Sequence, residues 1–149
     1  MKGNFSWHGF ATRDELASAF AAVVASHLAE AIAERGEAFL AVSGGTTPAK
    51  FFAALSTQAI AWEKVIVTLI DERFVPATSE RSNAALVAGN LLQHDAAAAR
   101  FVPLYHEAEN IEAAAAEADH ALRKLAWPLD AAVLGMGNDG HTASFFPDA

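Results

Sequence analysis

Cysteine is absent from this 149-residue chain, and basic residues are few. Without cysteine there is no disulfide, thiol nucleophile or cysteine-based metal site. Lys and Arg number 10 against 18 Asp and Glu, which gives a formal net charge of −8. This acidity, with no local cluster of Lys and Arg, argues against nucleic acid or an anionic membrane surface as a partner. A small anionic metabolite can still bind if backbone amides and one or two placed cations hold it.

Long apolar runs and a signal-peptide pattern are also missing. No uninterrupted apolar segment reaches the roughly 18 residues of a membrane-crossing helix, and the first residues lack the apolar core of a signal peptide. The six histidines show no metal-ligand spacing, so we expect no metal and no other cofactor. These absences favour a cytoplasmic protein without a membrane partner.

The apolar content is sufficient for one folded domain. Hydrophobic residues make up 53% of the chain, and without a linker or repeat we predict a single domain over residues 1–149. Buried strands are predicted at 39–43, 65–71, 101–105 and 131–137, and helices at 13–35, 49–55, 82–92 and 111–126. This alternation predicts an α/β fold, a Rossmann-like and mostly parallel sheet with helices on both faces.

Several predicted boundaries carry specific signals. Three residues suit helix N-caps: Thr12, Ser82 and Asn110. Glu15 completes a capping-box pattern at the first helix, and Gly36 suits its end. Pro48 fits the first turn of the second helix, and Pro103 places the run 101–105 at a sheet edge.

Three unusual segments each follow a predicted strand directly: SGGTTP (43–48), DERF (71–74) and GMGNDGH (135–141). Ligands of open parallel sheets bind beyond the carboxyl ends of the strands. We therefore expect the three segments to meet on one rim of the sheet and to form the binding site there.

The SGGTTP segment suits a phosphate. Gly44 and Gly45 leave several backbone N–H groups free beside the positive end of a helix dipole, and the hydroxyls of Ser43, Thr46 and Thr47 can add hydrogen bonds. A tight turn with a threonine cap and no ligand explains the same residues equally well. It is not a Walker motif, because the Gly-Lys-Ser/Thr ending is missing.

The DERF segment places Asp71, Glu72 and Arg73 at a strand end. Arginine can grip a phosphate with two N–H groups, and a carboxylate can orient sugar hydroxyls or act as a base. The competing interpretation is a surface ion pair of little energetic value, which would be the better interpretation of an isolated Asp-Glu-Arg.

The GMGNDGH segment fits a G-x-G-x-x-G pattern through Gly135, Gly137 and Gly140. A dinucleotide site is disfavoured, because the motif comes late and no good helix follows it. In the alternative interpretation the glycines bring backbone amides close to a substrate carbonyl, with Asp139 and His141 beside it. Histidine, with an ordinary pKa of about 6.5, suits proton transfer near neutral pH.

Together, SGGTTP, DERFVP with SN at 82–83, and GMGNDGHTASFFP resemble the landmark motifs of the 6-phosphogluconolactonase family over essentially the whole chain. The related glucosamine-6-phosphate deaminases share the fold and the Gly-Asp-Gly-His element. In their motif a glutamate stands where this chain has Phe146, and an aromatic residue stands where it has Arg73. Both departures favour the lactonase.

The resemblance implies metal-free hydrolysis of 6-phosphoglucono-1,5-lactone to 6-phosphogluconate in the pentose phosphate pathway. His141 would be the general base, Asp139 or Asp71 would orient it or the sugar hydroxyls, and amides of the glycine turns would hold the oxyanion. The residues expected to bind the substrate and its phosphate are Ser43, Gly44, Gly45, Thr46, Arg73, Ser82, Asn83 and Gly137. The rival functions are a deaminase, a non-catalytic sugar-phosphate sensor and a nucleotide-binding module.

Lactonases of this type continue well past the Phe-Pro motif, whereas this chain stops at Ala149. The resemblance therefore implies a chain shortened at its C-terminus. It also implies an uncovered sheet edge through which the chain can self-associate.

Overall fold

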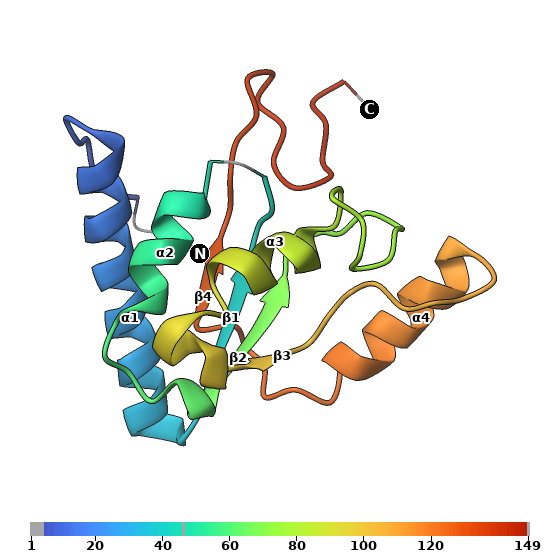
Figure 1. The fold of residues 1–149 in the computed structure, drawn as a ribbon, viewed down its shortest axis with the longest axis horizontal. Helices are drawn as coiled ribbons and strands as arrows, with labels where there is room; N and C mark the ends of the chain where they lie inside the picture. Colours follow the sequence, from blue (N-terminus) through green and yellow to red (C-terminus); the bar gives the residue numbers. More distant parts are fainter. Residues whose placement is uncertain (1–4, 46, 149) are drawn as a thin grey trace.

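The computed structural model describes residues 5–45 and 47–148. Its sheet has four strands in the order β3-β2-β1-β4, and every neighbouring pair is parallel. The elements are α1 (Arg13–Arg35), β1 (Ala38–Val42), α2 (Ala49–Ser56), η1 (Trp62–Lys64), β2 (Val65–Leu69), α3 (Asn83–Asn90), η2 (His94–Ala98), β3 (Arg100–Phe101), α4 (Ile111–Leu122) and β4 (Ala131–Val133). The predicted α/β class and parallel sheet are confirmed (Figure 1).

Helix α1 begins and ends where its capping residues predict. The Thr12 hydroxyl accepts a hydrogen bond from the Glu15 N–H at 3.1 Å, and the Glu15 carboxylate accepts one from the Ala11 N–H at 3.2 Å. Gly36 ends the helix with φ +84°, a left-handed conformation that favours glycine, and its N–H donates to the Ile32 carbonyl. Strong local signals at both ends thus set the boundaries of this helix.

Most of the other elements are shorter than predicted or shifted, whereas α2 ends at Ser56, one residue past the prediction. The strand predicted at 65–71 ends at Leu69, and the one predicted at 131–137 ends at Val133. Pro103 helps to confine β3 to two residues at a sheet edge, as expected. The third helix ends at Asn90 and the fourth at Leu122, and Pro48 is the N-cap of α2 rather than part of its first turn. Strand ends depend on pairing partners, which local patterns do not reveal.

Helices pack against both faces of the sheet. On one face α1, α2 and α3 bury their apolar side chains against residues such as Leu40 and Val67. On the other face, Phe39, Ile66 and Val102 contact Leu125 and the end of α4. Helix α1 is long and apolar enough to cross a membrane by length and composition, with a window of mean hydropathy 1.6. Its buried stripe, from Ala17 to Ala31, lies against the protein core instead.

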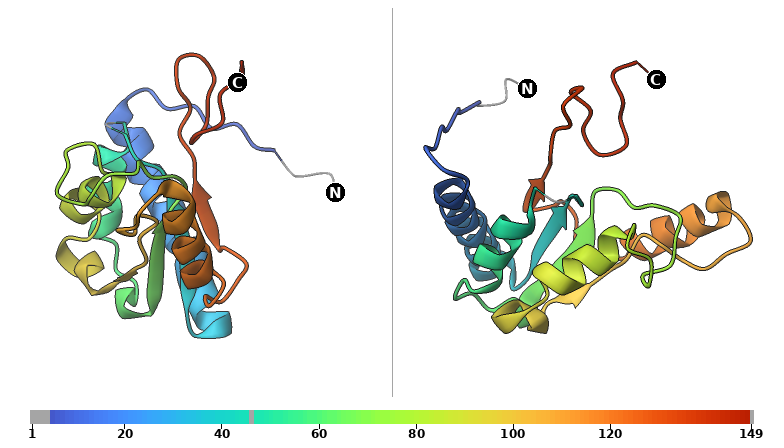
Figure 2. Two further views of the ribbon diagram at one scale, coloured as in Figure 1. Left: turned by 90° about the vertical axis from the view of Figure 1, so that its right-hand side faces the viewer. Right: turned by 45° about the horizontal axis from the view of Figure 1, so that its top comes forward.

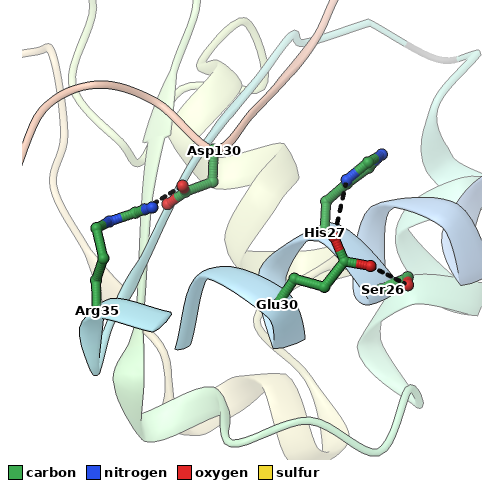
Figure 3. Close-up of polar contacts among 5 residues, drawn as sticks. All are labelled: Ser26, His27, Glu30, Arg35 and Asp130. Carbon is green, nitrogen blue, oxygen red and sulfur yellow. Dashed lines mark hydrogen bonds and ion pairs between the residues drawn. The ribbon is translucent and has the colours of Figure 1, made fainter. Parts of the chain in front are cut away.

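An ion pair ties the amino end of the sheet together. Arg35, the last residue of α1, pairs with Asp130 just before β4 (Figure 3). The Asp130 carboxylate also accepts a hydrogen bond from the Phe39 N–H at 2.7 Å, and the Asp130 N–H donates to the Phe39 carbonyl at 2.9 Å. These contacts hold β4 in register beside β1.

The chain reverses its direction of travel across the sheet between β1 and β4. After β1 it passes through α2 to β2 on one side, and it returns through α4 to β4 on the other side. In open parallel sheets, ligands bind at the carboxyl ends of the two strands that flank such a reversal. Segments 43–45 and 134–148 both leave the sheet at this position, beyond the arrowheads in Figure 1.

Candidate active site

The structure brings the three predicted segments together on one rim of the sheet (Figures 1 and 2). The Ser43 hydroxyl, at the end of β1, donates to the Val133 carbonyl of β4 at 3.0 Å. Farther along the rim, the Ser144 hydroxyl donates to the Asp71 carboxylate at 2.8 Å, across 73 positions of sequence. The first and second segments are therefore hydrogen-bonded to residues that flank the third.

Gly44 and Gly45 of the first segment are each required, for different structural reasons. Gly45 has φ +99°, where any side chain would be strained. A Cβ added to Gly44 would lie 1.8 Å from the Asn83 side-chain oxygen, so only glycine lets this amide pack against the turn. Ser43 is buried and its hydroxyl proton is committed to Val133. Thr46 lies outside the described residues.

The second segment holds Arg73 in place through neutral acceptors. Its Nη1 donates to the Arg81 carbonyl at 2.8 Å and to the Asn83 side-chain oxygen at 2.9 Å. Within residues 5–45 and 47–148 it forms no ion pair with a carboxylate, so the structure does not support the surface-ion-pair interpretation. The guanidinium keeps its positive charge and further N–H groups for an anion.

Ser82 and Asn83 lie beneath this surface rather than on it. They are 3% and 2% exposed. Ser82 caps α3 by accepting from the Ala85 N–H at 3.1 Å, and the Asn83 amide donates to the Asp71 carbonyl at 2.9 Å. Of these two residues, which were expected to bind substrate, Asn83 supports Arg73 and Asp71, whereas Ser82 contacts Ala85 and Glu72.

In the third segment, Asp139 and His141 form a close pair. His141 Nδ1 lies 2.5 Å from Asp139 Oδ1, and the His141 N–H donates to the same oxygen at 3.2 Å. The imidazole packs over Gly137, where an added Cβ would lie 2.2 Å from His141 Cε1. The Phe146 ring also stacks on the imidazole, with 4.9 Å between the ring centroids. The side chains of His141 and Asp139 are 35% and 59% exposed, so solvent reaches both.

This contact sets the protonation of the pair. The hydrogen bond from the His141 side chain, aided by its backbone N–H, lowers the pKa of Asp139 below its ordinary value. An ionised carboxylate only accepts hydrogen bonds, so Nδ1 carries the proton in the neutral ring. His141 Nε2 is then the nitrogen with a lone pair available to accept a proton.

The third segment, 135–141, uses two of its own backbone amides in internal hydrogen bonds. The Gly137 N–H donates to the His141 carbonyl at 2.8 Å, and the Gly140 N–H donates to the Gly137 carbonyl at 3.0 Å. These two amides are therefore committed within the loop, and an oxyanion would need other donors. Gly140, with φ +87°, forms the tight turn between Asp139 and His141.

Two residues of the site were given no firm role by the sequence. Glu72 accepts four hydrogen bonds around the start of α3, and Ser144 joins the last loop to Asp71. Their position inside recognisable motifs was the only available signal. Within the part of the chain that the structure describes, no three His, Asp or Glu side chains cluster as metal ligands would.

The model of the family of glucosamine-6-phosphate isomerases/6-phosphogluconolactonase matches residues 11–149. The chain belongs to this family. It is 70% identical over 146 residues to a 6-phosphogluconolactonase of Mesorhizobium japonicum, which covers 98% of this chain and 61% of that relative. A 6-phosphogluconolactonase of Rhizobium meliloti is 59% identical over 140 residues, covering 94% and 60%.

The family's fold is also present in solved structures. A crystal structure of a 6-phosphogluconolactonase from Shewanella baltica superposes with a TM-score of 0.90 at 46% identity, covering 93% of this chain and 59% of the other. The chain therefore spans about 60% of the length of the family members it matches.

Proposed function

We propose that this chain carries the catalytic residues of a 6-phosphogluconolactonase, which hydrolyses 6-phosphoglucono-1,5-lactone to 6-phosphogluconate in the pentose phosphate pathway. The observation that carries the proposal is the Asp139–His141 pair, 2.5 Å apart, in a loop whose flanking residues are hydrogen-bonded to the ends of β1 and of the segment after β2. The names of the 70% and 59% identical relatives support it. A cytoplasmic location is part of the proposal.

In the proposed reaction, His141 Nε2 accepts a proton from a water molecule while the water oxygen attacks the lactone carbonyl carbon. The ionised Asp139 holds Nδ1–H and stabilises the imidazolium that forms. The tetrahedral intermediate then expels the ring oxygen, which takes up the proton and becomes a hydroxyl. One water is consumed, and no covalent bond to the protein forms.

The phosphate would lie between the Gly44–Gly45 turn and Arg73. With Nη1 bound to Arg81 and Asn83, the guanidinium can approach a phosphate through its other N–H groups. This arrangement separates two tasks. Arg73 would bind the phosphate in substrate and transition state alike, whereas His141 would act only when the proton moves.

The proposal is tested by lactone turnover above spontaneous hydrolysis. The assay uses this chain and an extended chimaera, in which the remaining C-terminal residues of the Mesorhizobium japonicum relative follow residue 149. Turnover by either supports the proposal. Binding of 6-phosphogluconate without turnover would identify a sugar-phosphate sensor, and ammonia release from glucosamine 6-phosphate would identify a deaminase.

Self-association remains a prediction. Strand β4 is an edge of the sheet, and Leu134 and Met136, which follow it, are 56% and 81% exposed. Unpaired edges beside apolar side chains favour pairing between copies. Sedimentation of this chain as a monomer at micromolar concentration would contradict it.

A further inference from the structure

The Glu72 carboxylate sits at the centre of a four-fold hydrogen-bonded junction. Its Oε1 accepts from the N–H groups of Arg73 and Asn83, both at 2.8 Å. Its Oε2 accepts from the Ala84 N–H at 2.8 Å and from the Ser82 hydroxyl at 3.2 Å. The carboxylate thereby joins the segment after β2 to the first turn of α3.

This junction is more than a helix cap. Helix α3 already has a side-chain cap, because the Ser82 hydroxyl accepts from the Ala85 N–H. Glu72 adds a tie to residues ten to twelve positions away in sequence. It also binds the backbone N–H of Arg73, so it fixes the main chain from which the guanidinium projects.

The effect of the junction reaches the site through Asn83. The Asn83 N–H is bound by Glu72, and its side chain accepts from Arg73 at 2.9 Å and donates to the Asp71 carbonyl at 2.9 Å. The same side chain lies against Gly44 so closely that no Cβ fits there. One buried amide therefore contacts both Gly44 of the glycine turn and Arg73.

Glu72 itself is unsuited to proton transfer. A carboxylate has about four acceptor positions, and the four donors at Glu72 occupy them. We infer that Glu72 is a positioning residue: by clamping Arg73 and Asn83 to the start of α3, it fixes the Arg73 guanidinium for an anionic group of the substrate. This inference rests on the proposed function for the identity of that anion.

The first experiment follows the guanidinium directly. In ¹⁵N–¹H spectra of this chain, the Arg73 signals are assigned by their loss in Arg73→Lys. Hydrogen bonds from Nη1 restrict rotation, so we expect resolved Nη signals in the parent and averaged signals in Glu72→Ala. The control is Arg35→Ala, which removes the ion pair with Asp130 at the amino end of the sheet, opposite the rim.

The second experiment measures binding of 6-phosphogluconate by calorimetry. Glu72→Ala should raise the dissociation constant about tenfold, the loss expected when one charge-assisted hydrogen bond is misplaced. In an Arg73→Ala background the same substitution should change it less than twofold, because Glu72 acts through Arg73. Arg35→Ala should bind like the parent although it lowers the unfolding midpoint.

Each result decides the inference. The inference is overturned if the Arg73 signals are unchanged in folded Glu72→Ala. It is also overturned if the losses of 6-phosphogluconate affinity caused by Glu72→Ala and Arg73→Ala add fully in the double variant. Where Glu72→Ala does not fold, Glu72→Gln takes its place, since the amide keeps one acceptor oxygen and the size of the side chain. Absence of 6-phosphogluconate binding in both this chain and the extended chimaera refutes the proposed function, and the spectra then decide the role of Glu72 alone.

Discussion

The two ends of the sheet use similar residues in opposite ways. At the amino end, the Asp130 carboxylate pairs with Arg35 and accepts from the Phe39 N–H, with its side chain only 9% exposed. At the carboxyl end, the Asp139 carboxylate also pairs with a basic side chain, His141, but the two are 59% and 35% exposed. Figure 3 shows the Arg35–Asp130 pair, which joins the end of α1 to the chain before β4.

The comparison separates structural polar groups from groups available for chemistry. The Asp130 carboxylate is bound within the protein by Arg35 and the Phe39 N–H, so its contacts contribute to stability. Asp139 accepts from Nδ1 and from the backbone N–H of His141, which leaves Nε2 of the same ring with a lone pair for a ligand. A polar pair at the end of a strand is therefore a candidate for catalysis when one of its groups is left to act on a ligand.

The largest expected effect sharpens this contrast. His141→Ala, in whichever of the chain or the extended chimaera turns over lactone, should lower kcat by two to four decades, about 3 to 5 kcal/mol of barrier. Affinity for 6-phosphogluconate should change little, because the base acts only in the transition state. Retention of more than about a tenth of the parental kcat would move the base elsewhere, with Asp71 the first candidate.

A second prediction concerns the surface beneath the imidazole. Gly137→Ala places a Cβ within the volume of the His141 ring and should lower kcat about ten- to a hundredfold by displacing that ring from Asp139. Gly135→Ala is the matched control, because a Cβ there meets nothing within 4 Å. Similar kinetics for the two variants would contradict the packing argument.

At the opposite end, Asp130→Ala should affect stability and leave the chemistry intact. It leaves the Phe39 N–H and Arg35 without their partner, a loss of about 1 to 3 kcal/mol in the free energy of unfolding. Urea denaturation measures this loss, and kcat per folded molecule should equal that of the parent. A fall in kcat comparable with that of Gly137→Ala would break the proposed separation of the two ends.

The smallest expected effect is a pH dependence. The pKa of Asp139 is lowered in the folded state, so its pairing stabilises the fold above the ordinary carboxyl pKa, about 3.9. This contribution is lost as pH falls through the lower, folded-state pKa. We therefore expect the parent to lose its stability advantage over Asp139→Asn only below about pH 4, measured as unfolding midpoints between pH 3 and 6. An advantage that disappears near pH 6 would be inconsistent with the lowered pKa.

Local signals predicted the parts of the fold that local chemistry controls. The boundaries of α1 follow from Thr12 and Gly36, and the caps Ser82 and Asn110 accept the hydrogen bonds expected of them. Glycine-rich or charged segments at strand ends also indicated which segments meet on the rim. These features depend on a few consecutive residues, so the sequence contains them directly.

Contacts between distant segments were not predictable in this way. Nothing near Ser43 shows that its hydroxyl donates to Val133, and nothing near Asn83 shows that it is buried against Gly44. The amide of Gly137 looked free for an oxyanion, yet the loop folds back to use it. Contacts of this kind can be inferred only once the order of the strands in the sheet is known.

The pairing of β1 with β4 has a consequence for how the protein folds. Leu40 and Ala131 are partners in the sheet, so the chain must close a long loop before these strands meet, whereas β1 and β2 pair across a much shorter one. Contacts of high sequence separation carry a larger closure entropy and form slowly. Strand β4 leads into the His141 loop, so a folding chain should complete the proposed phosphate site around Gly44 and Arg73 first and acquire the proposed general base last. The time at which lactone turnover begins during refolding would then report when β4 pairs with β1.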